Sequence, residues 1–126
     1  MATAFDVLFV ALGAFVGAPA RFLVDRYVTD RTQTSFPLGT LLINLTGSLL
    51  LGVLTGIELR GHLPAELTAL LATGFCGTFT TFSTWSFETV RLIERGEIAH
   101  ALSNALGSVV LGLVAAGVGL ALVQSL

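Results

Sequence analysis

Residues 73–87 read Thr-Gly-Phe-Cys-Gly-Thr-Phe-Thr-Thr-Phe-Ser-Thr-Trp-Ser-Phe, and this stretch decides the fold. It lies in a run of 21 uncharged residues between Glu66 and Glu88, which is long enough to cross the hydrocarbon core of a bilayer as a helix. However, Gly77 and the threonines after it are poor helix formers, because glycine costs backbone entropy and threonine is β-branched. The stretch predicts either a transmembrane helix broken near its middle or a continuous helix whose hydroxyls bond to its own carbonyls.

The rest of the chain has the composition of an integral membrane protein. Of its 126 residues, 54% are hydrophobic and 11% are charged, whereas a soluble domain carries about a quarter charged residues. Two further runs contain no Asp, Glu, Lys or Arg, namely the 26 residues before Glu58 and the last 29 residues of the chain. We therefore predict an all-α membrane protein with a single four-span domain over residues 1–126. Its spans are expected at about 5–24, 37–57, 67–87 and 99–124.

Charge and cysteine content exclude several classes of protein. The net charge is -2 and lysine is absent, so the chain offers no electrostatic footprint for nucleic acid. A single cysteine, Cys76, excludes an internal disulfide framework and a cysteine-based zinc site. The four spans leave no room for a soluble catalytic domain, so we expect no enzyme. Ala-Pro-Ala at 18–20 is similar to a signal-peptide cleavage site, but Asp6 stands where such a peptide is positive.

Arginines are distributed unevenly between the two predicted sides of the membrane. An even number of spans places both termini on one side, together with Arg60. The other side carries five of the six arginines: Arg21, Arg26, Arg31, Arg91 and Arg95. The positive-inside rule then predicts that the termini face outward.

Polar and small residues of the second span recur at helical spacing. Thr40, Asn44 and Gly52 are separated by multiples of four residues and share one helix face. Gly52, like the pair Gly13 and Gly17 in the first span, predicts close packing between helices. An amide or a hydroxyl at membrane depth is costly unless it is paired or wet. Thr40 and Asn44 are therefore candidates for a polar pathway, and the Asn44 amide brings two N–H donors.

Aromatic residues of the third span are a second candidate lining. Phe82 and Trp85 are three residues apart and fall on one helix face. Such a stripe is commonly core or lipid-facing filler, but the edge of an aromatic ring carries partial positive charge. Rings turned edge-on can line a path for a small anion, and the hydroxyls of Ser83, Thr84 and Ser108 are further candidate donors.

The polar groups inside the spans are donors without formal charge. No Asp, Glu or Lys lies in the middle of a span, although such groups mark proton-coupled carriers. This inventory favours a pathway for anions over one for cations. The alternative function is a small proton-coupled multidrug exporter, which has four spans in a similar length. Such an exporter relies on a membrane-embedded glutamate in its first span, where this chain has only Asp6 at the edge.

Three motifs resemble those of the Fluc (CrcB) family of fluoride channels. They are Gly13-Ala-Phe-Val-Gly-Ala-Pro-Ala-Arg21, Gly39-Thr-Leu-Leu-Ile-Asn-Leu-Thr-Gly47, and Gly74-Phe-Cys-Gly77 with Thr80-Thr-Phe-Ser-Thr84 and Glu88. The resemblance implies a fluoride-selective channel of the plasma membrane that exports fluoride passively from the cytoplasm and lowers its toxicity. It also implies four-helix subunits with a broken third helix, assembled as antiparallel dimers with two fluoride pathways at the subunit interface.

The resemblance extends to individual positions along the fluoride pathway. Phe82 and Trp85 match the two positions of an aromatic box that lines the pore. Asn44 matches an asparagine that donates to the ion. Arg21 and Glu88 match polar positions near the aqueous vestibules.

The same resemblance implies a structural cation, and it has departures. Carbonyls matching Gly77 and Thr80 hold a central sodium ion between the two subunits. Trp85 stands where the family usually has phenylalanine, and its indole keeps an edge and gains an N–H donor. Thr78 stands where glycine is common. Asn104 replaces an aromatic residue of some members, which leaves its role open.

The expected partners are fluoride, membrane lipid and a second subunit. An antiparallel homodimer requires insertion in both orientations, which the arginine bias opposes unless Asp25 and Asp30 offset it by local pairing. A chain with one fixed orientation would instead form a heterodimer with an oppositely oriented relative. Nucleic acid is not an expected partner.

Overall fold

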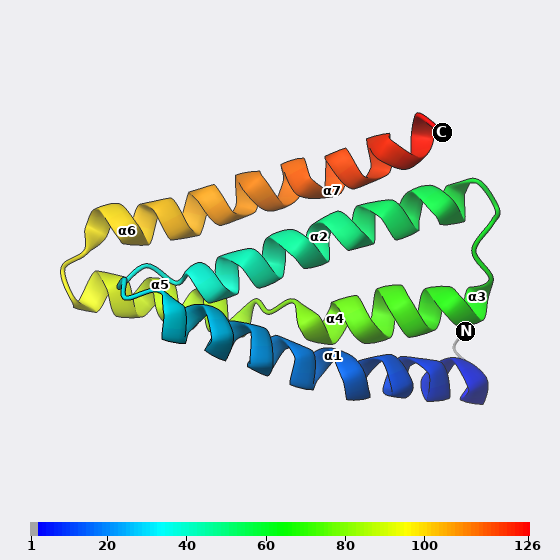
Figure 1. Ribbon diagram of the computed structural model, residues 1–126, viewed down its shortest axis with the longest axis horizontal. Coiled ribbons are helices and arrows are strands. Elements are labelled where there is room, and N and C mark those ends of the chain that lie inside the picture. The colour runs from blue at the N-terminus through cyan, green and yellow to red at the C-terminus, as the bar shows by residue number, and fades with distance from the viewer. Residues whose placement is uncertain (1–2) are drawn as a thin grey trace.

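The computed structural model describes residues 3–126, which are helical with short connections and contain no strand. Figure 1 shows rods lying side by side along the long axis, with each rod antiparallel to the one before it in the chain and both chain ends at the same end. The predicted all-α architecture is confirmed. In chain order the helices are α1 (Ala4–Arg31), α2 (Leu38–Leu59), α3 (Ala65–Leu67), the π-helix η1 (Thr68–Cys76), α4 (Gly77–Phe79), α5 (Ser83–Glu94), α6 (Ile98–Leu102), the π-helix η2 (Ser103–Gly107) and α7 (Ser108–Gln124).

Helix α1 begins at a capping box and runs past the end of the predicted span. The Thr3 hydroxyl accepts from the Asp6 amide at 3.2 Å, and the Asp6 carboxylate accepts from the Thr3 amide at 2.8 Å. Asp6 is therefore engaged in starting the helix. The helix continues from position 24 to Arg31, so its 28 residues extend about 42 Å, more than the apolar core of a bilayer is thick.

Within residues 3–126, three helical stretches are long and apolar enough to cross a membrane: α1, α2 and the continuous stretch Ile98–Gln124 that comprises α6, η2 and α7. The predicted span 67–87 has a different form. It is divided among η1, α4 and α5, and residues 80–82 between α4 and α5 are not helical. Thr80 there has φ -76° and ψ 157°, which is extended backbone.

Small residues let the rods approach closely. Helix α2 packs mainly against α7, and α1 packs against η1 and α4. A methyl group at Gly52 would collide with the Ala116 carbonyl of α7, and one at Gly13 would collide with the Leu70 carbonyl of η1. The close packing predicted for these glycines is confirmed, and such backbone approach is the usual basis of helix association in lipid.

Candidate functional site

An open groove of about 460 Å³ lies between α2, α7 and the segment that joins η1 to α5. Six residues that the sequence nominated for the pathway or the cation line it: Asn44, Gly77, Thr80, Phe82, Trp85 and Ser108. The other lining residues are Gly47, Ser48, Leu51, Ala72, Cys76, Thr81, Val109, Gly112, Leu113 and Ala116. The lining contains hydroxyls, one amide and aromatic rings, and no carboxylate or basic side chain.

The side chain of Asn44 pairs with the backbone of Thr81 at the helix interruption. The Thr81 amide donates to Asn44 Oδ1 at 2.9 Å, and Asn44 Nδ2 donates to the Thr81 carbonyl at 3.0 Å. The Asn44 amide thus replaces the helical partners of Thr81, which satisfies backbone groups that would otherwise be costly in an apolar environment. A side-chain amide has two N–H donors, so one remains for the groove.

The interruption redirects amides away from two carbonyls of the groove. In a regular helix the Thr81 amide bonds to the Gly77 carbonyl, and the Thr84 amide bonds to the Thr80 carbonyl. Here the Thr81 amide is held by Asn44, and the Thr84 amide donates to Thr81 Oγ1 at 3.2 Å. The carbonyls of Gly77 and Thr80 therefore lack their usual helical donors.

Hydroxyls before the interruption bond back along their own helix. Thr78 Oγ1 donates to the Gly74 carbonyl and Thr80 Oγ1 donates to the Cys76 carbonyl, both at 2.8 Å. This back-bonding is the behaviour expected of a continuous helix, yet regular helix ends at Phe79. Back-bonding hydroxyls therefore occur here together with a non-helical stretch at residues 80–82.

The rings of Phe82 and Trp85 stand side by side on the groove wall. Their centroids are 5.1 Å apart and their planes are tilted by 43°. The Phe82 side chain is 77% exposed within the single chain, so most of its ring is available to a partner, to lipid or to an ion. The expected N–H donor of Trp85 does not serve the groove, because Nε1 donates to the Asn104 carbonyl at 3.0 Å.

Thr40 and Glu88 lie beyond one end of the groove. Thr40 is 1% exposed, and its hydroxyl donates to Glu88 Oε1. Thr40 precedes Asn44 by one turn of α2. Glu88 borders a second cavity of about 280 Å³, whose other lining residues are Ser35, Pro37, Phe87, Arg91, Leu92 and Arg95. Thr40 therefore lies one helical turn from Asn44 of the groove lining and is hydrogen-bonded to Glu88 of the second cavity's lining.

The remaining nominated residues are not part of the groove lining. Thr84 Oγ1 accepts from the Thr81 hydroxyl at 3.1 Å, which places Thr84 directly behind the interruption. Ser83 is exposed, and its hydroxyl lies 3.5 Å from Thr81 Oγ1. Arg21 is half-buried on α1, and among residues 3–126 no ion pair joins it to Glu88.

The family model described as CrcB-like protein, Camphor Resistance (CrcB), matches residues 8–120 of this chain. The chain belongs to this family. Three similar proteins carry the name Fluoride-specific ion channel. FluC 1 of Streptomyces avermitilis is 49% identical over 119 residues, which cover 94% of this chain and 96% of the relative. FluC 2 of Moorella thermoacetica is 46% identical over 112 residues, covering 89% and 91%. FluC 2 of Mycobacterium tuberculosis is 50% identical over 104 residues, covering 82% and 79%.

Two further residues of this CrcB-like chain were not among the predicted site residues, namely Thr81 in the groove lining and the buried Asn104. Thr81 is 9% exposed and is the backbone partner of Asn44, but nothing in a run of threonines marks one of them as the partner. Asn104 is fully buried, and its amide donates to Thr89 Oγ1 at 2.8 Å. Its spacing of four from Ser108 was the available signal, since Ser108 Oγ donates to Asn104 Oδ1 at 3.2 Å.

The cation predicted from the sequence of this CrcB-like chain was placed on two backbone carbonyls. Residues 3–126 contain no group of three or more His, Cys, Asp or Glu side chains that could hold an ion. Hard cations prefer oxygen ligands, and backbone carbonyls without helical donors are of that kind. The carbonyls of Gly77 and Thr80 fit such a cation, because the amides that would occupy them are engaged elsewhere.

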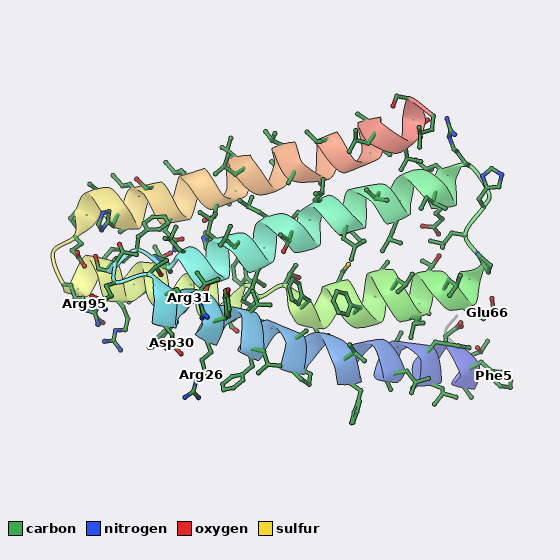
Figure 2. All side chains as sticks on the ribbon, viewed as in Figure 1. Phe5, Arg26, Asp30, Arg31, Glu66 and Arg95 are labelled. Carbon is green, nitrogen blue, oxygen red and sulfur yellow. The ribbon has the colours of Figure 1, made fainter. Side chains whose placement is uncertain are left out.

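Arginine side chains gather at the end of the bundle opposite the chain ends. Figure 2 shows Arg26, Arg31 and Arg95 at that end, and Phe5 and Glu66 at the other. Neighbouring side chains offset little of the positive charge of these arginines. Arg26 Nε lies 4.0 Å from Asp30 Oδ2 on the exposed surface, and the Arg31 guanidinium lies 3.7 Å from the centre of the Tyr27 ring. Exposed pairs of this kind contribute little free energy.

Proposed function

We propose that this chain is a fluoride-selective channel of the plasma membrane that conducts fluoride passively out of the cytoplasm and so lowers its toxicity. The observation that carries the proposal is the position of Asn44. Its amide lines the groove beside Phe82 and Trp85, and one of its N–H groups has no partner among residues 3–126. The FluC names of relatives at 46% to 50% identity support the same substrate.

The chemistry of the groove suits a small, strongly hydrated anion. Fluoride must exchange its water for other donors, and uncharged N–H, O–H and ring-edge hydrogens offer this without a fixed positive charge that would trap the ion. Passive conduction follows from the same lining, because no side chain there can shuttle protons as a carboxylate does.

The alternative function, a proton-coupled multidrug exporter, has less support. Such a carrier needs an ionisable group embedded in the membrane. Asp6 of the first span caps helix α1 at its start, which is a structural use for this carboxylate. The next carboxylate near the groove is Glu88, which accepts a hydrogen bond from Thr40 at the border of the second cavity.

The proposed channel is multi-pass, and the fluoride path continues from the groove past Thr40 to the second cavity. Residues 67–87 form its remaining span, with the break at 80–82 near mid-membrane, so that the open groove supplies the environment that bare carbonyls need. Ser83 and Thr84 contribute hydroxyls to the path, and Ser108 lines it while its own hydroxyl donates to Asn104. Glu88 lies at a vestibule, and Arg21 belongs to the aqueous approach.

The proposed assembly is an antiparallel dimer in lipid, with the groove facing the partner. An open groove and the 77% exposure of Phe82 support this arrangement, since a second subunit would cover both. A two-fold axis would bring the carbonyls of Gly77 and Thr80 together with their equivalents, giving four oxygens for a structural sodium ion. We favour the homodimer. The uneven distribution of arginines is the argument for the other form, a heterodimer with an oppositely oriented relative.

Anion efflux from liposomes tests the function. Purified protein in vesicles loaded with potassium fluoride or potassium chloride, with valinomycin as the counter-ion carrier, should release fluoride at least a hundredfold faster than chloride. Equal release of the two anions would overturn fluoride selectivity. Dye efflux that requires a proton gradient would support the exporter instead.

Sodium replacement tests the cation separately. Vesicles prepared with N-methylglucamine in place of sodium should lose most of their fluoride efflux and recover it when sodium is restored. Unchanged efflux after exhaustive exchange would argue against a structural sodium ion and would leave the fluoride pathway intact.

A further inference from the structure

Trp85 belongs to a closed circuit of hydrogen bonds that joins α5 to η2. Its indole Nε1 donates to the Asn104 carbonyl at 3.0 Å. The Asn104 amide donates to Thr89 Oγ1 at 2.8 Å, and the Thr89 hydroxyl donates to the Trp85 carbonyl at 2.8 Å. The circuit therefore holds Trp85 both by its ring and by its backbone.

Asn104 is the fixed point of this circuit. It is 0% exposed, and the Ser108 hydroxyl donates to its Oδ1 at 3.2 Å, so both ends of its side-chain amide are bonded. Its carbonyl accepts from the Ser108 amide as well as from the indole, which uses both lone pairs. Each polar atom of the Asn104 side chain has a partner, and a buried network of this kind resists rotation, because turning the amide would leave a polar atom without one.

The circuit decides which part of the indole meets the groove. Asn104 is buried and does not line the groove, so the Trp85 N–H is directed into the protein. The indole therefore offers the groove only carbon-bound hydrogens and its ring face, with its plane tilted 43° from that of Phe82. Trp85 can then act in the groove as an enlarged phenylalanine.

We propose that Asn104 is a positioning residue for Trp85 and thereby sets the anion preference of the groove. The proposal rests on the fluoride pathway proposed above. With its N–H held, the indole keeps one orientation and one distance from Phe82. Without the Asn104 side-chain bonds, the Asn104 carbonyl that accepts from the indole is no longer held in place. The ring can then turn, which misplaces the ring edge and widens the passage for larger anions.

The intrinsic fluorescence of the protein tests the positioning role without any flux measurement, since Trp85 is its only tryptophan. Asn104→Leu keeps a similar volume and removes both side-chain bonds. In this variant the emission anisotropy should fall and quenching by acrylamide should at least double, while helix content is retained. Ser103→Ala, an exposed neighbour on η2, should change neither signal. Unchanged anisotropy and quenching in Asn104→Leu would overturn the proposal.

A second variant, which breaks the circuit at another residue, keeps the positioning role testable if the first variant does not fold. Thr89→Val deletes the hydroxyl that links Asn104 to the Trp85 carbonyl and conserves the shape of the side chain. If Asn104→Leu does not fold, Thr89→Val should give the same loss of anisotropy. A signal equal to that of the unmodified protein would overturn the proposal.

A double-mutant cycle separates positioning of the indole from a general structural effect. Asn104→Leu should lower fluoride efflux about fivefold, the factor carried by one net hydrogen bond, and should lower the fluoride-to-chloride ratio. In a Trp85→Phe background there is no N–H to hold, so the same substitution should have little further effect. An equal loss in both backgrounds would overturn the proposal. Absence of fluoride efflux from the unmodified protein would overturn the proposed function, and the fluorescence comparison would still decide the positioning role.

Discussion

The side chain of Asn44 holds both backbone polar groups of Thr81, accepting from its amide at 2.9 Å and donating to its carbonyl at 3.0 Å. These residues are 37 positions apart, on α2 and in the interruption before α5. One amide therefore does two things. It takes the Thr81 amide, so residues 80–82 stay non-helical and the Gly77 carbonyl lacks its helical donor. It also presents its remaining N–H to the groove. The proposed anion path and the proposed cation site thus share a single side chain.

Replacement of Asn44 by aspartate is the most direct test of that side chain. Asn44→Asp keeps an acceptor for the Thr81 amide, but it loses the Nδ2 donor and places negative charge in the groove. We expect fluoride efflux to fall at least tenfold, because both changes raise the energy of the anion there. Thr55→Ala, an exposed α2 threonine that bonds only to the Leu51 carbonyl, is the control. Full efflux in Asn44→Asp would remove Asn44 from the pathway.

The aromatic lining is tested by a ring deletion. Phe82→Ile keeps an apolar side chain and removes the ring edge beside Trp85. Fluoride efflux should fall by at least tenfold, while size-exclusion profile and helix content stay unchanged. Phe15→Ile is the matched control, since Phe15 is 81% exposed and does not line the groove. Equal efflux from the Phe82 variant and its control would count against the ring edge as a ligand.

The connection between Thr40 and Glu88 predicts a loss upon deletion of one hydroxyl. Thr40→Val conserves shape but leaves the half-buried Glu88 carboxylate without this donor. A charged acceptor that loses its partner is penalised, so we expect fluoride efflux to fall roughly fivefold to tenfold. Thr40→Ser should retain most efflux because it keeps the hydroxyl.

Thr46→Val provides the control for the loss of a threonine hydroxyl from α2, because Thr46 donates only to carbonyls of its own helix. Its efflux should match that of the unmodified protein. If Thr40→Val shows the same efflux as Thr46→Val, Thr40 does not contribute to the path.

Helix packing predicts opposite effects for two glycine substitutions. Gly52→Ala places a methyl group against the Ala116 carbonyl, and overpacking of this kind costs about 1–3 kcal/mol. Gly117→Ala meets nothing within 4 Å in the chain and gains helix propensity of about 1 kcal/mol. In thermal unfolding of the detergent-solubilised protein, Tm should fall by several degrees for the first variant and not for the second. A higher Tm for Gly52→Ala would contradict the close approach of α2 to α7.

The site was only partly accessible from sequence. Helical spacing placed Asn44 on the face of α2 that meets the groove, and it placed Phe82 and Trp85 together. Spacing was uninformative for the pairing of Thr81 with Asn44. It related Asn104 to Ser108 but not to Trp85, which lies on another element. Residue identity credited Trp85 with an N–H donor, but it does not say which neighbour that donor meets, and the donor bonds to the Asn104 carbonyl.

The sequence by itself determined the all-helical class, the long apolar helices α1, α2 and Ile98–Gln124, and the uncharged character of the polar residues within them. These properties depend on local hydropathy and on charge spacing along the chain. Only the tertiary structure decided that Asn44 takes the Thr81 backbone, that Asn104 takes the Trp85 indole, and that Thr40 turns to Glu88. A hydrogen bond needs its donor and acceptor within about 3 Å and in line, and that condition is met by packing one helix against another, not by the order of residues within either.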